Sequence, residues 1–342
     1  MRFLSDNTAP AAPEVLAALQ EVNTGRVHAY GDDEWTQRLE QRFSEYFGTP
    51  VRAFAVTTGT AANSLALATL VPPYGAIYAH QEAHIVVDEC GAPGFFSGGA
   101  QLALLPGEHG RIGADTLAAT LKDLRTDVHT VQAAALSLTQ PTELGTAYRP
   151  AELRRLCELA HGRGLKVHMD GARFANVVAF LDCHPGDITW RSGVDVLSFG
   201  ATKNGALGAE AVVFFDHALV RDFELRRKRA GHLMSKSRYV AAQLLAYLDG
   251  GLWLRNAGRA NALAQELAAA AGSHLLHPVE ANEVFLHLGH EGRERLRAAG
   301  FEFYDWGPVS AGDARLVVSW DQPEAEVRAL AAALRALPAT AP

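Results

Sequence analysis

The feature that most constrains this chain is an alternation of short apolar runs with amphipathic helical stretches. The runs that predict strands lie at residues 51–56, near Ile77, and at 101–105, 131–138, 165–170, 194–200 and 209–215. Helices are predicted from Pro13 to Gly25, at 33–48, at 61–70 and between several later runs. Apolar strands separated by amphipathic helices are typical of a mainly parallel sheet covered by helices on both faces. The sequence therefore predicts an α/β fold.

The pattern changes after residue 215. Residues 216 to about 272 are predicted to be almost wholly helical. The tail then alternates strands and helices in the order 282–288, 290–299, 301–304, 314–320 and a last helix from Pro323, which is typical of a small α+β domain. We therefore expect an N-terminal arm at residues 1–18, a large domain at 19–250 and a small C-terminal domain at 251–342.

Charge and composition exclude several classes of protein. The net charge of -7 gives no electrostatic support to a nucleic-acid partner or to an acidic membrane surface. No apolar run is long enough to cross a bilayer, and residues 1–15 lack the apolar stretch of a secretory signal. Cys90, Cys157 and Cys183 are far apart and odd in number, so we expect a reduced, cytoplasmic setting. No spacing of histidines or acids predicts a metal site.

Three polar clusters follow predicted strands, at the edge where ligands gather in open α/β sheets. In the first, a strand runs into Thr58, Gly59 and Thr60, and a helix begins directly afterwards. A helix N-terminus offers free N–H groups and a partial positive charge to a phosphate, and glycine lets the backbone approach it closely. The alternative is a plain helix start with Thr60 as the N-cap residue.

The second cluster is formed by Asp170, Gly171 and Arg173, where the run 165–170 ends. A carboxylate at this point can bind a protonated ring nitrogen. Because the preceding strand is predicted to be buried, the carboxylate needs a positive or hydrogen-bond-donating partner. The alternative is that Asp170 caps the following helix, which is the commoner role of an aspartate at a strand end.

The third cluster surrounds Lys203, which stands among small residues such as Gly200, Ala201 and Gly205 between two apolar runs. Most lysines are exposed, but only five of the 31 basic residues here are lysines, and this one has almost no charged neighbour in the sequence. Desolvation in such a segment lowers the pKa of a lysine, and the neutral amine is the form that makes a Schiff base.

Together these clusters supply the three groups that pyridoxal phosphate (PLP) needs, namely a phosphate site, an acid for the pyridine nitrogen and a lysine amine. Competing motifs are incomplete. Gly200 and Gly205 have the spacing of a P-loop, but Ala206 and Leu207 replace its Lys and its Ser or Thr. No G-x-G-x-x-G opens a strand–helix unit, so a nicotinamide site lacks its motif. The sequence therefore predicts a PLP enzyme.

A wider set of segments resembles one family. These segments are, in order, YGDDEWT, GTAANSLAL, DECGAP, SLTQPTELGT, HMDGARFAN, FGATKNG and WLRNA. They resemble the L-threonine aldolases, which are PLP enzymes of fold type I, the aspartate-aminotransferase fold, and they are most similar to the low-specificity branch of pseudomonads. The resemblance covers nearly the whole chain. It implies a lyase that splits L-threonine, L-allo-threonine and related β-hydroxy-α-amino acids into glycine and an aldehyde.

The resemblance also implies which residues hold the cofactor. Lys203 would carry it as a Schiff base, and Asp170 would pair with the pyridine nitrogen. Gly59 and Thr60 would bind the phosphate through backbone and hydroxyl groups. His84, in the segment QEAHIVVDE, would stack on the ring and is a candidate base.

Further roles concern the substrate and the assembly. Ser5, Arg173 and Arg315 would bind the substrate carboxylate, for which the planar fork of arginine is well suited, and Arg173 would also lie beside the cofactor. His129 would be a second active-site histidine and the alternative base. Tyr30 would reach the site of a neighbouring subunit, so the resemblance implies a homotetramer with active sites at the dimer interface.

Three segments depart from the family pattern, and several alternatives stay open. Leu4, the run Thr139–Thr142 and residues 226–238 differ from many members, which affects the expected substrate range more than the cofactor. Alternatives of the same fold are a phenylserine or hydroxyaspartate aldolase, a C–S lyase, an aminotransferase or a hydroxymethyltransferase. A non-catalytic PLP-binding regulator and an inactive oligomerisation domain are less favoured, because the chain lacks a DNA-binding module and keeps Lys203, Asp170 and Arg173.

Overall fold

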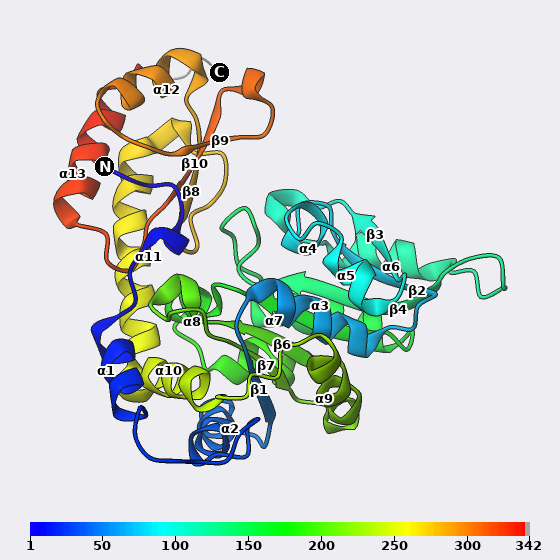
Figure 1. The fold of residues 1–342 in the computed structure, drawn as a ribbon. Coiled ribbons are helices and arrows are strands. Elements are labelled where there is room, and N and C mark those ends of the chain that lie inside the picture. The colour runs from blue at the N-terminus through cyan, green and yellow to red at the C-terminus, as the bar shows by residue number, and fades with distance from the viewer. Residues whose placement is uncertain (339–342) are drawn as a thin grey trace.

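The computed structural model describes residues 1–338 and contains two β-sheets connected through a long helix (Figure 1). The seven-stranded sheet has the order β1-β7-β6-β5-β4-β2-β3 and the three-stranded sheet the order β8-β10-β9. The strands of the large sheet are β1 (Arg52–Val56), β2 (Gly75–His80), β3 (Gln101–Leu105), β4 (Gln132–Thr139), β5 (Lys166–Gly171), β6 (Val196–Gly200) and β7 (Glu210–Phe214). Those of the small sheet are β8 (Glu283–His287), β9 (Tyr304–Trp306) and β10 (Asp313–Val317).

Most neighbouring strands of the large sheet are parallel. The pairs β3–β2, β2–β4, β4–β5 and β5–β6 are parallel, whereas β7 runs antiparallel to both β6 and β1. Because β7 is antiparallel to both of its neighbours, β1 has the same direction as β6. The carboxyl ends of β1, β4, β5 and β6 therefore meet at one edge of the sheet, and the predicted mainly parallel sheet is confirmed.

Helices cover both faces of this sheet. The helices on one face are α2 (Glu34–Phe47), α6 (Ala114–Lys122), α7 (Pro150–His161), α8 (Phe174–Leu181) and α10 (Arg238–Leu248). Those on the other face are α3 (Gly59–Leu70), α4 (His84–Val87) and α9 (Val220–Arg229). The remaining helices are α1 (Pro13–Glu21), α5 (Ala92–Ser97), α11 (Leu252–Ala271), α12 (Gly289–Ala298) and α13 (Glu324–Arg335).

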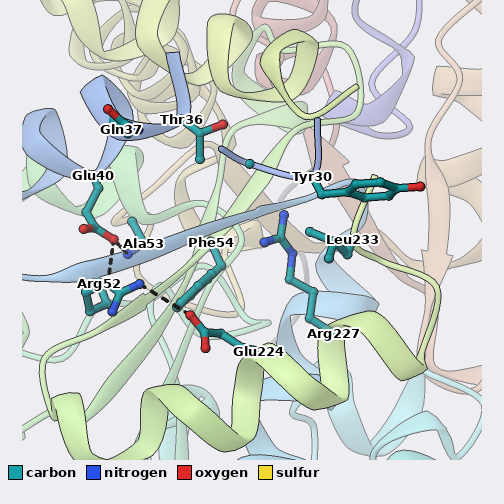
Figure 2. Close-up of a pocket in the computed structure, with 11 residues that line it drawn as sticks. Tyr30, Thr36, Gln37, Glu40, Arg52, Ala53, Phe54, Glu224, Arg227 and Leu233 are labelled. Atoms are coloured by element: carbon teal, nitrogen blue, oxygen red, sulfur yellow. Dashed lines mark hydrogen bonds and ion pairs between the residues drawn. The ribbon is translucent and has the colours of Figure 1, made fainter. Parts of the chain in front are cut away.

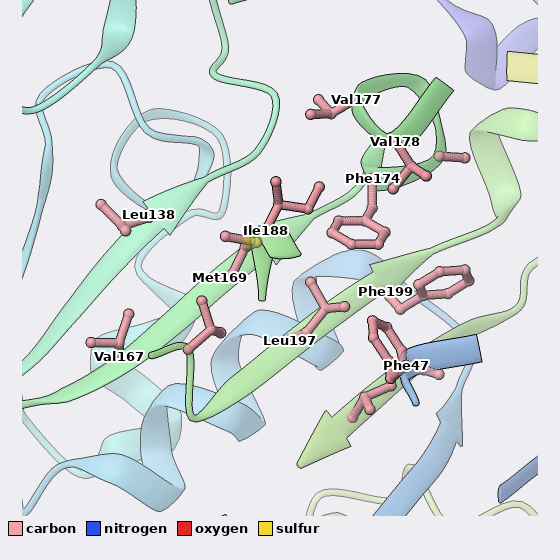
Figure 3. Close-up of a cluster of buried hydrophobic side chains, with 14 of the residues drawn as sticks. Phe47, Leu138, Val167, Met169, Phe174, Val177, Val178, Ile188, Leu197 and Phe199 are labelled. Atoms are coloured by element: carbon pink, nitrogen blue, oxygen red, sulfur yellow. The ribbon is translucent and has the colours of Figure 1, made fainter. Parts of the chain in front are cut away.

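The alternation of side chains along the strands decides which face carries the polar residues. Val167 and Met169 of β5 pack with Leu197 of β6 and with Phe174 of α8 in one buried cluster (Figure 3). Successive residues of a strand point to opposite faces, so Asp170 faces α3 instead. A slip of one residue would turn this carboxylate into the apolar cluster, so burial of the core fixes the register that places it.

The N-terminal segment runs along both sheets. Phe3 is buried in the core of the small sheet, where its backbone N–H donates to Glu302 O at 2.8 Å and its carbonyl accepts from Val317 N at 2.9 Å. Further along, Ala12 and Val15 pack with Leu252 at the start of α11. Helix α11 contacts both α8 of the large sheet and α13 of the small one. The division of the chain near residue 250 stays a proposal.

A few elements differ from the expected ranges. Helix α1 ends at Glu21 instead of near Gly25, because the intervening Asn, Thr and Gly favour turns over helix. Helix α3 begins at Gly59, two residues earlier than expected. The strand expected at 301–304 is β9 at Tyr304–Trp306, since Phe301 and Phe303 are buried in the small core. Within residues 1–338, no helix is both long and apolar enough to span a bilayer.

Candidate active site

A cavity of about 400 Å³ lies at the edge of the large sheet where the parallel strands end. It brings together five residues that the sequence singled out, which are Gly59, Thr60, His84, Asp170 and Lys203. They come from the start of α3, from α4, from the end of β5 and from the turn after β6. Its wall also contains Asn63 and Glu210, to which sequence reasoning gave no role.

The start of α3 forms one end of the cavity. Its N-cap residue is Thr58, whose hydroxyl accepts from Ala61 N at 3.2 Å, so the alternative with Thr60 as the cap is wrong. Thr60 instead lies in the first turn, where helix geometry leaves the backbone N–H groups of Gly59 and Thr60 without intrahelical acceptors. A Cβ atom at Gly59 would meet no protein atom within 4 Å, so the backbone is open to a ligand here. This end of the cavity can bind a phosphate.

Lys203 lies in a short 3-10 turn, Thr202–Asn204, directly after β6. Gly200, at the end of β6, packs so tightly against the residue after β5 that a Cβ atom there would lie 2.2 Å from Ala172 O. This close packing holds the turn beside the end of β5, and Lys203 and Asp170 therefore line the same cavity. In the described part of the chain, no acidic side chain forms an ion pair with Lys203.

Asp170 does not cap the following helix, because the N-cap residue of α8 is Arg173. Its carboxylate is 3% exposed and accepts from Asn63 Nδ2 at 2.8 Å and from Ala172 N at 3.0 Å. The carboxylate is thus held at the floor of the cavity by two neutral donors. A protonated ring nitrogen would give it the positive partner that a buried carboxylate favours.

A second buried carboxylate, Glu89, holds His84. Its Oε1 lies 2.9 Å from His84 Nδ1 and also accepts from Asn63 Nδ2 at 2.8 Å. The hydrogen bond to Glu89 raises the pKa of His84, helped by the charges of Asp170 and Glu143 and opposed by burial. Burial also raises the pKa of Glu89. Because both pKa values are raised, the His84–Glu89 pair tends to retain a proton. The sequence contained Glu89 and Asn63 in DECGAP and GTAANSLAL, but no rule on spacing connects the two segments.

Arg173 does not line the cavity, although the adjacent Ala172 does, and two acids lie against its guanidinium. Asp6 accepts from its Nε at 2.7 Å and from its Nη2 at 2.9 Å, and Glu283 lies 3.3 Å from its Nη1. Although burial opposes the charged form, the Asp6 and Glu283 carboxylates raise the pKa of Arg173. Asn282 Nδ2 also donates to Asp6 at 3.0 Å. Sequence reasoning missed both acids, because their positions in the chain lie far from residue 173.

Two more acids near the cavity have raised pKa values. Burial and the neighbouring Glu283 carboxylate raise the pKa of Glu143 to about 7. Burial likewise raises the pKa of Glu210 to about 7, although hydrogen bonds from Thr202 and from Ala201 N, the latter at 2.9 Å, oppose the shift. Perturbed acids of this kind concentrate at functional sites.

Neither Ser5 nor Arg315 lines the cavity. Ser5 precedes Asp6, and its hydroxyl accepts from Asn7 N at 3.2 Å. Arg315 of β10 pairs with Phe285 of β8, two pairs along from Val317 and Glu283. Side chains two positions apart on a strand point to the same face, so Arg315 and Glu283 share one face of the small sheet. The Arg315 guanidinium lies 5.5 Å from the centre of the Trp306 ring.

Tyr30 is not at this cavity. It is 53% exposed and has a φ of 62°. It lines a separate cavity of about 310 Å³ that also contains Arg52, Phe54 and Arg227 (Figure 2). The Lys228 ammonium lies 4.7 Å from the centre of its ring. Within one chain, Tyr30 therefore cannot be assigned to the Lys203 cavity.

His129 lies at the opposite edge of the sheet. It is an exposed residue in the loop before β4, where its backbone N–H donates to Asp127 Oδ1 at 3.0 Å. The cavity lies at the other end of the parallel strands, and a strand of the length of β4 spans about 25 Å. The structure of the single chain thus does not bring His129 to Lys203, because its sequence position precedes the strand instead of following it.

Comparisons with known proteins agree in pointing to one family. A model of the β-eliminating lyase family matches residues 2–291. A low-specificity L-threonine aldolase from Pseudomonas sp. (strain NCIMB 10558) is 44% identical over 341 residues, which are 98% of this chain and 97% of that protein. The structure of Leishmania major threonine aldolase superposes with a TM-score of 0.91 at 25% identity, over 98% of each chain. A serine palmitoyltransferase variant from S. paucimobilis, solved with a bound PLP–myriocin aldimine, shares the fold at 18% identity, with a TM-score of 0.68 over 98% of this chain and 87% of that one.

Proposed function

The chain belongs to the β-eliminating lyase family and, within it, to the low-specificity L-threonine aldolases, and we propose on this premise that it cleaves L-threonine, L-allo-threonine and related β-hydroxy-α-amino acids to glycine and an aldehyde. The observation that carries the proposal is that Lys203, Asp170 and the start of α3 line a single cavity. The amine, the acid and the phosphate site thus lie together, as a PLP lyase requires.

The residues present fit PLP. The cavity volume of about 400 Å³ lies in the range usual for cofactor sites. We propose that Lys203 would bind the cofactor through its ε-amine, that Asp170 would pair with the pyridine nitrogen, and that Gly59 and Thr60 would bind the phosphate. His84 would lie against the ring. The bound cofactor supplies an electron sink for the electron pair that remains on Cα when the Cα–Cβ bond breaks.

The substrate carboxylate is proposed to bind Arg173, with Ser5 and Arg315 completing the site. Asp6 accepts from Nε and Nη2 of the guanidinium, and Glu283 lies 3.3 Å from Nη1, so a substrate carboxylate would bind the remaining N–H groups of Nη1 and Nη2 beside Glu283. Because Asp6 fixes the plane of the guanidinium, the substrate would bind in one orientation. Orientation matters for this reaction, since only the bond held perpendicular to the cofactor plane is activated.

His84 is proposed as the base that removes the β-hydroxyl proton, and its position in the cavity favours it over His129. The O–H bond of the substrate breaks and an N–H bond forms at His84 Nε2. The electron pair of the O–H bond becomes the second C–O bond of the aldehyde as the Cα–Cβ bond breaks. Imidazole is suited to this step because its pKa lies near neutral pH.

The assembly and the compartment are further parts of the proposal. Tyr30 is exposed and lies outside the Lys203 cavity of its own chain, which supports a role at the site of a neighbouring subunit. We therefore propose a homotetramer with active sites at the dimer interface, located in the cytoplasm. Sedimentation of the purified protein, with Tyr30→Ala as a variant, would test the assembly.

A product assay tests the function against its alternatives. L-threonine alone should yield acetaldehyde and glycine in equal amounts. An aminotransferase would need a keto acid, and a hydroxymethyltransferase would need folate. L-allo-threonine, the D-forms and phenylserine should be measured beside L-threonine, because the proposed low specificity predicts turnover of both L-epimers. No aldehyde from any of these amino acids would exclude the aldolase assignment.

A further inference from the structure

We propose that Glu89 is a positioning residue that keeps a proton on Nδ1 of His84 and thereby reserves Nε2 as the atom that accepts the β-hydroxyl proton. The proposal rests on His84 as the base of the proposed function and adds the group that controls its tautomer. It begins from a buried carboxylate whose segment, DECGAP, carries no role so far.

The contacts of His84 distinguish its two ring nitrogens. Nδ1 lies 2.9 Å from Glu89 Oε1, whereas no described residue forms a hydrogen bond with Nε2. His84 lines the cavity, and Glu89 lies behind it with a side chain that has no exposed surface. A carboxylate only accepts hydrogen bonds, so an ionised Glu89 requires the proton of a neutral imidazole to be on Nδ1. The lone pair is then on Nε2.

Asn63 links this arrangement to the cofactor acid. Its Nδ2 carries two hydrogens, and it donates at 2.8 Å to Glu89 Oε1 and at 2.8 Å to Asp170 Oδ2. One ring nitrogen of His84 and one carboxylate oxygen each of Glu89 and Asp170 all lie within 4.8 Å of one another. Two carboxylates this close repel each other, and the amide between them provides a donor to each. Asn63 thus allows both acids to be ionised in a buried place.

Charge on Glu89 also makes His84 a stronger base. When Nε2 takes the substrate proton, the imidazolium that forms lies against the Glu89 carboxylate, where burial strengthens the attraction. The titratable groups that act on His84 are Glu89 from the segment after α4, Asp170 from the end of β5 and Glu143 from the loop after β4, and all three raise its pKa. Of these three acids, Glu89 alone forms a hydrogen bond with the ring, so Glu89 can select the tautomer.

The first experiment uses NMR of the protein labelled with ¹⁵N-histidine, with His84→Asn to assign the signal. At pH 8, wild-type His84 should carry its proton on Nδ1 and none on Nε2. In Glu89→Gln the pKa of His84 should fall by about 1–2 units, and the tautomer preference should weaken. Glu89→Asp keeps the charge and should retain part of the shift. Glu82→Gln removes one charge two residues from His84 and should leave the signal unchanged.

The second experiment measures turnover of L-threonine by the holoenzymes across pH. In Glu89→Gln, kcat should fall by about 10- to 100-fold, and the acidic limb of kcat/KM should move to lower pH by the same shift that NMR records. A wild-type tautomer with the proton on Nε2 would overturn the proposal even if Glu89→Gln does not fold. So would an unchanged His84 titration in Glu89→Gln, or a moved titration without a moved pH profile. Failure of the wild type to release aldehyde would instead refute the proposed function, and it would leave the NMR result standing by itself.

Discussion

The Asp6 carboxylate accepts two hydrogen bonds from Arg173, at 2.7 and 2.9 Å, although 167 positions separate the two residues in the chain. Both side chains are almost completely buried, at 2% and 6% exposure. A buried carboxylate and a buried guanidinium each need the other, because neither is solvated by water. The first turn of the chain therefore belongs to the candidate active site.

This relationship predicts the effect of Asp6→Asn. Removing one partner of a buried ion pair should cost about 3 kcal/mol of unfolding free energy or more, and KM for L-threonine should rise as Arg173 loses its orientation. Burial opposes ionisation of Asp6, but Arg173 and Lys203 lower its pKa below that of an unfolded aspartate. The stabilisation is thus present above about pH 4 and disappears as the pH falls further. The wild type and Asp6→Asn should therefore have similar free energies of unfolding at acidic pH.

Urea unfolding at several pH values, with KM measured at neutral pH, checks this prediction. Glu302→Gln is a matched control, because Glu302 forms an exposed pair with Arg2 at 3.6 Å and should contribute less than about 0.5 kcal/mol. An unchanged KM in Asp6→Asn would show that the orientation of Arg173 by Asp6 does not contribute to substrate binding.

Lys203→Ala tests the cofactor site. The variant should lose the visible absorbance of the lysine-bound cofactor together with turnover, because no other lysine among residues 1–338 lines the cavity. Lys122→Ala, at the exposed end of α6, should keep both. Absorbance spectra of dialysed proteins and an aldehyde assay give the answer, and an unchanged spectrum in Lys203→Ala would exclude the assignment.

The two candidate histidines should behave differently. His84→Asn should lower kcat by about 100- to 10,000-fold, the range expected for loss of a general base. His129→Asn should leave kcat within about twofold, since His129 is exposed at the far edge of the sheet. Steady-state kinetics on L-threonine compare them. A large loss in His129→Asn would show that a neighbouring subunit brings this residue to the site.

Glu210 predicts a pH dependence of stability. Its pKa in the folded protein is raised to about 7, above the value of about 4.3 in an unfolded chain. The folded state binds the extra proton, so wild-type stability should fall as the pH rises from about 4.5 to about 7, by up to about 3 kcal/mol. Glu210→Gln should lack this loss and should be more stable than the wild type at pH 8.

Urea midpoints of the holoenzymes at pH 5 and pH 8 measure the difference at one protein concentration. Glu158→Gln, on the exposed side of α7, is the control and should follow the wild type at both pH values. If the urea midpoint of Glu210→Gln falls between pH 5 and pH 8 as much as that of the wild type, the prediction is wrong. Glu210 would then already be ionised in the folded protein at pH 5.

Much of the fold could be predicted from the sequence because the strands of the large sheet are apolar on both sides. Burial on both faces leaves runs such as 194–200 little choice of conformation. The small sheet was harder to predict. Phe303 carries the same apolar signal as a strand residue, yet it belongs to the core beside β9, not to its ladder. The local sequence pattern indicates which residues are buried, whereas tertiary contacts decide which strands pair.

The candidate site was predictable only where its residues end strands or begin helices. Gly59, Asp170 and Lys203 follow that rule, and a cavity joins them. Asn63, Glu89 and Glu283 do not follow it, because each gains its role from a side chain on a distant element. A polar residue inside an apolar helix, such as Asn63 in α3, is the one local signal that was available. His129 does not follow the rule either, since it precedes its strand, and its role at the site stays a prediction.

The Asp6–Arg173–Glu283 contact has a consequence for synthesis of the chain. The walls of the cofactor cavity come mostly from residues 57–210, whereas the carboxylate site needs the first turn of the chain and a strand near residue 283. During synthesis, the residues that form the cofactor cavity would therefore leave the ribosome well before the strand near residue 283 that completes the substrate carboxylate site. Extra residues fused before Met1, whose amino group donates to Gly300 O at 2.8 Å, would disturb the second site and spare the first.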